Sequence, residues 1–265
     1  TLFIMAKNRK VALALSGGVD SAFAARVLLK RGYTVEAFTL KIPFLSNGYL
    51  ERASLLCSKL GITHHIIDVE RKFKKDIVKY FIDSYLEGLT PNPCARCNHD
   101  IKFGLLFKET QKRGFDLFAT GHYADTIEKD GRFCIKKAPY ENNSQEYFLA
   151  LVSESVLKHC LFPLGKYSKE KAIEQIAQVY PFPVPSSREV CFVRNKDYRE
   201  FISSFIKDNS LYEGFIRYHD GRVLKRHNGI YNNIPCLGIN VRNIQWRAPR
   251  YSQTPALAVC VIVNS

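Results

Sequence analysis

The sequence contains no long hydrophobic run, since no apolar stretch approaches the roughly 20 residues that a helix needs to cross a bilayer. It also contains no internal repeat and no low-complexity tract, which excludes repeat and solenoid architectures. The segment before Met5 is far too short for a secretory signal peptide. These absences predict a cytoplasmic protein without a membrane partner.

Acidic residues are scarce relative to basic ones, because 25 Asp and Glu stand against 39 Lys and Arg, a formal net charge of +14. This excess predicts a polyanionic partner, since neutralising phosphates releases counterions. Residues 211–265 carry aromatic side chains, seven basic residues and only two acids, a composition that suits a nucleic-acid backbone and its bases. The alternative is a basic bias without functional meaning.

A phosphate-binding loop is predicted at Ser16–Ser21, which reads SGGVDS and follows the apolar run Val11–Leu15. A helix is expected from Ala22 to Arg31, so that glycine amides, a helix N-terminus and two hydroxyls converge on one point. The motif is neither the dinucleotide fingerprint GxGxxG nor the P-loop GxxxxGKS/T. It resembles the pyrophosphate loop of the N-type ATP pyrophosphatases, which split ATP into AMP and pyrophosphate.

Strands and helices are expected to alternate through the first half of the chain, which predicts an α/β fold with a doubly wound parallel sheet. Ligands of such sheets bind beyond the carboxyl ends of the strands, where Thr120–Tyr123 would join Ser16–Ser21. The expected strands are Val11–Leu15, Tyr33–Leu40, His64–Val69 and Asp116–Ala119, and the expected helices are Ala22–Arg31, Leu50–Leu60, Lys72–Leu86 and Ile101–Arg113. Thr90–Asn98 is expected to be a loop.

The second half is expected to be more irregular. A hairpin is predicted over Thr126–Lys136, turned by Asp130-Gly131. Further helices are expected at Tyr147–Val152, Ser168–Tyr180 and Asp197–Ile206, and short β-prone pieces follow from about residue 212. We therefore divide the chain into an α/β domain over residues 1–140, a central helical segment over 141–210 and a β-rich module over 211–265.

Eight cysteines in a reducing compartment are expected to be free thiols, metal ligands or catalysts. Cys94 and Cys97 form a CxxC for which three functions stay open: half of a zinc site, a dithiol redox pair, or a loop that offers a nucleophilic thiol. Arg96 would favour the thiolate of Cys97. Five cysteines in apolar contexts are predicted to be buried in the core, namely Cys57, Cys134, Cys160, Cys236 and Cys260.

Six short motifs in series resemble the tRNA-specific 2-thiouridylases of the MnmA/TrmU type. They are SGGVDS, TPNPxxxCN with a following IKF, ATGHY, QxYFL, FPLG and EVCFV, which occur in this order between about residue 10 and about residue 206. The resemblance implies an N-type ATP pyrophosphatase domain of the adenine nucleotide alpha hydrolase type. A small helical segment and a reduced β-barrel-like module would follow it.

The resemblance also implies an ATP-dependent tRNA-uridine 2-sulfurtransferase. The family adenylates the C2 oxygen of the wobble uridine and releases pyrophosphate, because a carbonyl oxygen is otherwise a poor leaving group. A persulfide sulfur then displaces AMP and produces 2-thiouridine. ATP and Mg²⁺ are the implied cofactors, and tRNA and a persulfide donor protein or relay are the implied partners.

Position in the motifs implies a role for each candidate residue. Cys191 would carry the persulfide, Cys97 would release its sulfur by forming a disulfide, and Asp20 would hold Mg²⁺. The implied ATP-binding residues are Ala14, Leu15, Ser16, Gly17, Gly18, Val19, Asp20, Ser21, Leu40 and Gly121. The implied tRNA-binding residues are Asn92, Pro93, His122, Asn143, Ser144, Gln145, Arg250 and Tyr251. For His122 the alternative is a histidine satisfied within its own turn.

The chain departs from the family pattern at two places near the chemistry. Cys94 stands where many relatives have Asp, and with Cys97 and Cys191 it would supply three thiolates for a 4Fe-4S cluster with one open iron. This cluster stays an alternative to the persulfide relay. Ser144 replaces an acid that is expected to help at the RNA site.

The C-terminal part departs further. Residues 228–239 resemble a family stretch whose basic centre is missing here, and the connection to Arg250 and Tyr251 has about ten residues instead of several dozen. We therefore expect an abbreviated C-terminal module. Two other functions stay open: thiolation of another tRNA base by an ATP pyrophosphatase, and tRNA binding without catalysis. The intact SGGVDS motif argues against the second.

Overall fold

The computed structural model describes residues 9–139, 144–183, 190–193, 197–208, 212–218, 221–232, 244–246 and 260–263. The chain forms two compact units that interleave in sequence. Unit 1 comprises residues 1–74 and 94–188, and unit 2 comprises residues 75–93 and 189–265. The division at residues 140 and 210 that the sequence predicts stays a prediction.

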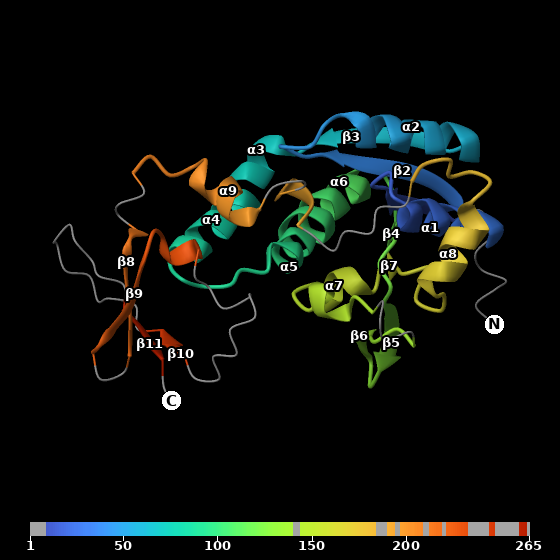
Figure 1. The fold of residues 1–265 in the computed structure, drawn as a ribbon. Helices are drawn as coiled ribbons and strands as arrows, with labels where there is room; N and C mark the ends of the chain where they lie inside the picture. Colours follow the sequence, from blue (N-terminus) through green and yellow to red (C-terminus); the bar gives the residue numbers. More distant parts are fainter. Residues whose placement is uncertain are drawn as a thin grey trace. The chain divides into compact units, whose positions relative to one another are not determined.

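A five-stranded parallel sheet forms the centre of unit 1 (Figure 1). Its strands are β1 (Lys10–Ala14), β2 (Thr34–Lys41), β3 (Thr63–Asp68), β4 (Leu117–Thr120) and β7 (Cys160–Leu161), in the spatial order β3-β2-β1-β4-β7. The chain therefore runs outward from β1 through β2 to β3, and then returns to the other side of β1 with β4. This order confirms the predicted doubly wound fold, and β7 is a strand that the sequence did not predict.

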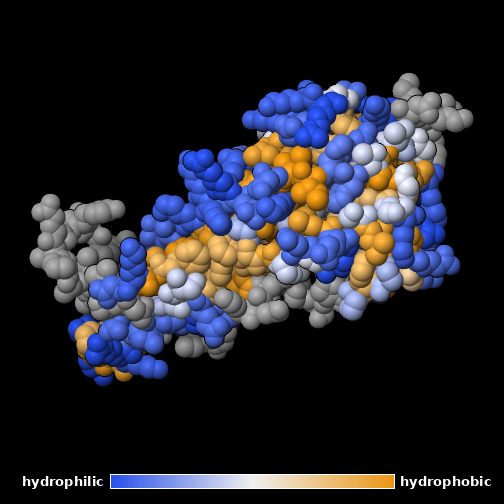
Figure 2. All heavy atoms as spheres, turned by 90° about the horizontal axis from the view of Figure 1, so that it is seen from above, coloured by the Kyte–Doolittle hydropathy of each residue, from blue (hydrophilic) through white to orange (hydrophobic). Residues whose placement is uncertain are grey.

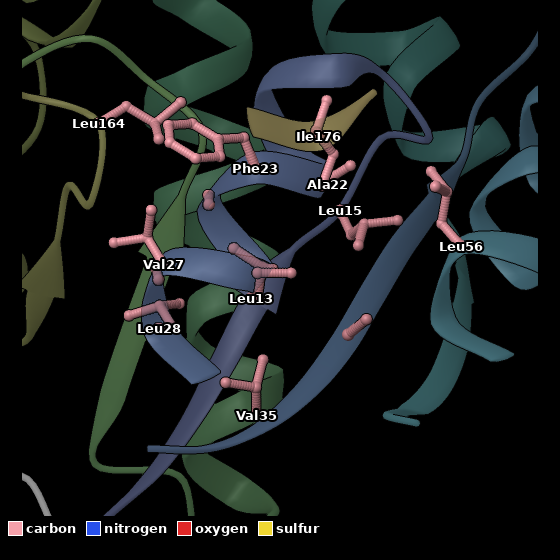
Figure 3. Close-up of a cluster of buried hydrophobic side chains, with 14 of the residues drawn as sticks. Leu13, Leu15, Ala22, Phe23, Val27, Leu28, Val35, Leu56, Leu164 and Ile176 are labelled. Carbon is pink, nitrogen blue, oxygen red and sulfur yellow. The ribbon is translucent and has the colours of Figure 1, made fainter. Parts of the chain in front are cut away.

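Helices cover both faces of this sheet because its strands are apolar on both sides. On one face, α1 (Val19–Lys30), α2 (Gly48–Leu60) and α8 (Lys169–Ile176) pack around Leu13 of β1 and Leu15, the residue after it (Figure 3). On the other face, the π-helical segment Asn98–Leu106, α6 (Phe107–Lys112) and α7 (Glu154–Leu157) pack around Ala12 and Phe118. The strands are thus fixed by burial on both sides, as parallel sheets require.

Hydrophilic side chains lie over much of the described surface in Figure 2, with hydrophobic patches between them. Among the helices of the described residues, none combines the length and the apolar character that a bilayer crossing requires.

The long helix predicted over Lys72–Leu86 is present in three parts: α3 (Glu70–Phe73), a π-helical turn at Lys74–Val78 and α4 (Lys79–Leu86). The loop predicted at Thr90–Asn98 is wrong in its second half, because α5 occupies Pro93–Cys97. Proline is well suited to a first helical position, since it lacks the N–H that has no partner there. The predicted helix at Tyr147–Val152 is a short 3₁₀ turn at Glu146–Leu149.

The hairpin consists of β5 (Asp125–Lys129) and β6 (Arg132–Lys136). Asp130 and Gly131 both have positive φ angles of 52° and 74°, as a tight two-residue turn requires. This hairpin corrects one prediction: Cys134 is exposed, because it lies on the outer face of a two-stranded ribbon. Cys57 and Cys160 are buried as predicted, and the side chains of Cys236 and Cys260 lie outside the described residues.

Unit 2 contains α4, α9 (Tyr198–Ser203) and a 3₁₀ turn at Cys191–Val193, held by an aromatic cluster. Phe192 packs edge-on against Phe81 with ring centroids 5.3 Å apart, and Phe201 completes the cluster. A four-stranded sheet in the order β10-β11-β8-β9 belongs to the same unit. Its strands are β8 (Gly214–Tyr218), β9 (Val223–His227), β10 (Ile244–Trp246) and β11 (Cys260–Val263).

Candidate active site

The loop Ser16–Gly18 lies where the sheet changes its winding direction. The loop follows the carboxyl end of β1. In the sheet, β2 lies on one side of β1 and β4 lies on the other side, so the chain moves in opposite directions from this strand. Residues 121–123 leave the carboxyl end of β4 next to it. Adjacent loops that diverge in this way leave a crevice between them, which is where ligands of doubly wound sheets bind.

The loop is held by its own hydroxyls. The Ser16 amide donates to Oγ of Ser21 at 3.2 Å, and this hydroxyl donates to the carbonyl of Gly18 at 2.9 Å. Gly18 stands at the N-cap of α1, so no side chain caps the first amides of the helix. The positive end of the helix and its amides therefore suit an anion.

Two glycines allow close backbone contacts at the loop. Gly17 has a φ of +75°, and a Cβ atom there would lie 2.6 Å from the carbonyl oxygen of Tyr49. A Cβ atom on Gly121 would lie 2.9 Å from the amide nitrogen of Ser21. The segment after β4 thus packs directly on the first turn of α1, and any side chain at position 121 would displace one of the two.

The carboxylate of Asp20 has two partners from distant parts of unit 1. The Lys169 ammonium is 2.5 Å from both carboxylate oxygens, and the Tyr123 hydroxyl donates to Oδ1 at 2.8 Å. Tyr123 is buried, and burial together with Asp20 raises the pKa of its phenol. The phenol therefore stays a hydrogen-bond donor at all physiological pH values.

The four predicted ATP residues with apolar side chains divide into two pairs. The side chains of Leu15 and Val19 are buried in the core of the α1 face, so these residues can offer only backbone groups to a ligand. Ala14 and Leu40 are only partly buried, and both pack on the opposite core. The Tyr49 hydroxyl donates to the carbonyl of Leu40 at 3.1 Å, and so links the end of β2 to the helix that contacts Gly17.

His122 follows β4 and is held by Thr120, whose Oγ1 is 2.7 Å from Nδ1 of the imidazole. Burial, and secondarily the positive charge of Lys102, hold the pKa of His122 well below its usual range. The imidazole is therefore neutral at physiological pH. The bond to Thr120 fits the alternative of a histidine satisfied in its own turn, and it leaves a role toward RNA untested.

Gln145 is joined to the segment after β4 by two hydrogen bonds. Its amide donates to the carbonyl of Tyr123 at 2.8 Å, and its Oε1 accepts from the Tyr123 amide at 3.0 Å. Ser144 braces the same turn, because its hydroxyl accepts from the Ala138 amide and donates to the carboxylate of Glu146. Gln145 is thus bonded to Tyr123, the residue after His122, while Asn143 lies outside the described residues.

The CxxC lies on α5, where Cys94 is exposed and Cys97 is half-buried. Although Cys94 presents exposed surface, the chain around its thiol desolvates it enough to raise its pKa, and Lys102 opposes this increase. Arg96 Nε donates to Asp100 Oδ2 at 2.5 Å, so its charge is shared with a carboxylate. The expectation that Arg96 activates Cys97 stays a prediction.

The remaining candidates belong to unit 2 or lie outside the described residues. Cys191 is half-buried at the start of its 3₁₀ turn, next to the buried Phe192. The Asn92 amide donates to the hydroxyl of Tyr80 at 3.3 Å, and Pro93 is buried. Arg250 and Tyr251 lie outside the described residues. Within the part of the chain that the structure describes, no group of three or more His, Cys, Asp or Glu could hold a metal ion.

Three residues of this site had no predicted role: Tyr49, Tyr123 and Lys169. Tyr123 belongs to the ATGHY motif, so a signal for it was present, but its partner Asp20 lies 103 positions away. Lys169 lies 149 positions from Asp20 and four positions beyond the FPLG motif. Nothing in a single sequence pairs such distant residues.

Comparison with known proteins agrees with the motifs. The family described as the tRNA methyl transferase HUP domain matches residues 9–195. A tRNA-specific 2-thiouridylase MnmA of Treponema denticola is 41% identical over 234 residues, which cover 83% of this chain and 64% of that protein. One of Clostridioides difficile is 37% identical over 243 residues, which cover 85% and 66%. These relatives confirm the resemblance stated from the motifs, and the chain spans about two thirds of their length.

A solved structure supports the fold. The crystal structure of a 4-thiouridine synthetase–RNA complex with bound ATP matches with a TM-score of 0.50 and 20% sequence identity, covering 74% of this chain and 50% of that chain. Likeness at this identity concerns the fold alone. With the sheet order and the match to the HUP domain family, it confirms the predicted α/β fold with a doubly wound parallel sheet.

Proposed function

The chain belongs to the tRNA methyl transferase HUP domain family, and from this premise we propose that it is an ATP-dependent tRNA-uridine 2-sulfurtransferase. The proposal depends on one observation above all, the contact of Gly121 with the first turn of α1 at Ser21, which joins the loops after β1 and β4. The names of the relatives support the choice of uridine thiolation. Since the chain spans about two thirds of those relatives, the activity of the whole protein is our proposal.

We propose that ATP lies with its phosphates against the amides of Ser16–Ser21 at the N-terminus of α1. Ala14 and Leu40 would offer apolar surface to the adenine, because they are the partly buried predicted residues on one face of the sheet. Gly121 would admit the nucleotide close to the backbone. Leu15 and Val19 would take part only through their backbone, since their side chains are in the core.

Asp20 fits a role as a magnesium ligand, because it presents a half-exposed carboxylate in the first turn of α1 and already attracts one cation. When bound, Mg²⁺ would neutralise charge on the phosphates. The loop amides would orient the nucleotide, and Tyr123 holds the carboxylate of Asp20 in position through its hydroxyl.

We propose that sulfur arrives as a persulfide on Cys191. The terminal sulfur would attack C2 of the adenylated uridine and expel AMP with the former C2 oxygen. Cys97 thiolate would then attack Sγ of Cys191, so that the sulfur–sulfur bond breaks, the sulfur stays on uridine and a Cys97–Cys191 disulfide forms. A dithiol reductant must reduce this disulfide, and a persulfide donor protein must reload Cys191, before the next turnover.

We propose that tRNA contacts the region around His122. Asn92, Pro93, Ser144 and Gln145 are further tRNA-binding candidates, and Asn143, Arg250 and Tyr251 are proposed from their motifs alone. A neutral imidazole, which is how burial keeps His122, can accept or donate one hydrogen bond to a base without competing for phosphates. Such a reaction takes place where tRNA and ATP are available, and we propose the cytoplasm.

The 4Fe-4S alternative needs thiolates from both compact units, since Cys94 and Cys97 belong to unit 1 and Cys191 to unit 2. Among the described residues no set of three ligands is assembled, so we derive no step through a cluster. Anaerobic purification with iron reconstitution tests this alternative. A colourless protein that thiolates tRNA from a persulfide donor would end it.

An assay in vitro tests the function. The protein would be incubated with ATP, Mg²⁺, unmodified tRNA transcript and a persulfide donor, and nucleosides would be separated by mass spectrometry. We expect 2-thiouridine at the wobble position and one pyrophosphate per modified base. Thiolation of another base would favour the alternative pyrophosphatase. No pyrophosphate release in the presence of tRNA would favour a binding protein without catalysis.

A further inference from the structure

The carboxylate of Asp20 is already paired with a cation that belongs to the chain. The Lys169 ammonium lies 2.5 Å from each of its two oxygens, in a pair whose side chains are 28% and 34% exposed. Lys169 is the first residue of α8, which packs on α1 in the same core. The pair therefore joins the first turns of two neighbouring helices, of which α1 begins directly after the loop Ser16–Gly18.

The position of Lys169 is not one that stabilises its own helix. A positive charge in the first turn lies at the positive end of the helix dipole, where acidic side chains are favoured. Ser168 caps α8 by accepting from the amide of Lys171 at 3.3 Å, so the helix does not need Lys169 as a cap. The partner that compensates this unfavourable position is Asp20.

We propose that Lys169 is a placeholder cation: it occupies the Asp20 carboxylate in the nucleotide-free protein and moves to a phosphate of ATP when nucleotide binds. Asp20 would thereby become available to Mg²⁺. This inference rests on the proposed use of ATP. Tyr123 keeps the carboxylate in place during the exchange, because its hydroxyl bonds Oδ1 independently of Lys169.

The exchange is physically reasonable for three reasons. A partly exposed ion pair contributes little net stability, so releasing it costs little. The lysine stem is flexible and its ammonium can donate in several directions. A polyphosphate carries more negative charge than one carboxylate, and Lys169 sits beside the loop whose amides would hold that polyphosphate.

Isothermal titration of the full chain tests the proposal with Lys169→Met and Lys169→Arg. Lys169→Met should weaken MgATP binding by roughly ten- to a hundredfold, the usual loss for one charged hydrogen bond. Lys169→Arg should retain most of the affinity. Lys171→Met is the matched control on the same helix, because its ammonium lies over the ring of Tyr167, 5.9 Å from the centroid, and not at Asp20. It should bind MgATP like the wild type.

Binding of Mn²⁺ without nucleotide, followed by electron paramagnetic resonance, tests the placeholder itself. Lys169→Met should bind Mn²⁺ severalfold more tightly than the wild type, since this variant has no lysine ammonium at the carboxylate of Asp20. A variant that was merely misfolded would not gain metal affinity, and circular dichroism checks the fold. Unchanged Mn²⁺ affinity, or unchanged MgATP affinity in Lys169→Met, would overturn the inference. A wild-type protein that binds no MgATP would instead overturn the proposed function.

Discussion

His122 shows how a single residue can make stability depend on pH. Burial depresses the pKa of its imidazole in the folded protein, whereas in the unfolded chain the pKa returns to about 6.5. Below that pH the imidazole binds a proton in the unfolded chain but not in the folded protein. The free energy of unfolding should therefore fall as pH drops below about 6.5, by up to about 1.4 kcal/mol per pH unit from this residue.

Urea unfolding at pH 7.5 and pH 5.5 measures this effect. We expect His122→Gln to lose a smaller part of its stability between the two pH values than the wild type loses. His99→Gln is the control, because His99 is an exposed histidine that pairs with Asp100. An identical pH dependence in His122→Gln and wild type would show that the imidazole is not held neutral by its surroundings.

At the scale of single residues, the sequence predicts only part of the candidate site. The loop Ser16–Ser21 and Gly121 are predictable because each lies in a short motif directly after a strand. The hydrogen bonds of Asp20 are not predictable from the sequence, because Tyr123 and Lys169 come close to Asp20 only when the sheet has folded. The alternation of apolar residues predicts that such strands exist and leaves open which polar side chains meet at their ends.

At the scale of secondary-structure elements, the close approach of the segment after β4 to α1 at Gly121 gives a prediction. In Gly121→Ala the new methyl group would lie 2.9 Å from the Ser21 amide nitrogen and 3.0 Å from the carbonyl carbon of Asp20, both backbone atoms of α1. Such overpacking costs about 1–3 kcal/mol of stability. The displaced turn should also weaken MgATP binding in titration calorimetry.

Gly48→Ala is the matched control, because the nearest atoms to a Cβ there are side-chain atoms of Arg52 and Ser46, both 3.9 Å away. Gly48 begins α2, where alanine fits as well as glycine. We expect this variant to unfold at the wild-type denaturant concentration. Wild-type MgATP affinity in Gly121→Ala would mean that the contact between the two loops does not shape the nucleotide site.

The elements themselves were largely predictable, and the exceptions have physical causes. Four strands of the sheet follow from apolar runs bounded by turns. The fifth, β7, has only two residues and carries no periodic signal. Proline misled the prediction for Pro93–Cys97, since it breaks helices in their interior but begins them well. Cys134 is apolar in context yet exposed, because a lone hairpin has no core on its outer face.

At the scale of the whole molecule, the proposed chemistry uses one thiol from each compact unit. Cys97 belongs to unit 1 and Cys191 belongs to unit 2. Cys191 is anchored by Phe192 in the aromatic cluster, and Cys97 by the helix that starts at Pro93. The two thiols of the proposed relay are therefore supported by different local contacts.

Cysteine variants test this division of labour. Cys97→Ser and Cys191→Ser should each abolish formation of 2-thiouridine, while tRNA-dependent pyrophosphate release in a single turnover should persist, because adenylation precedes sulfur transfer. Cys134→Ser is the matched control, since its thiol is exposed on the hairpin and has no proposed role.

Cys94→Ser separates the two sulfur routes: full activity with a persulfide donor excludes a cluster ligand at position 94. Thiolation at the wild-type rate by Cys191→Ser would refute the relay, because no other cysteine is proposed to carry the sulfur.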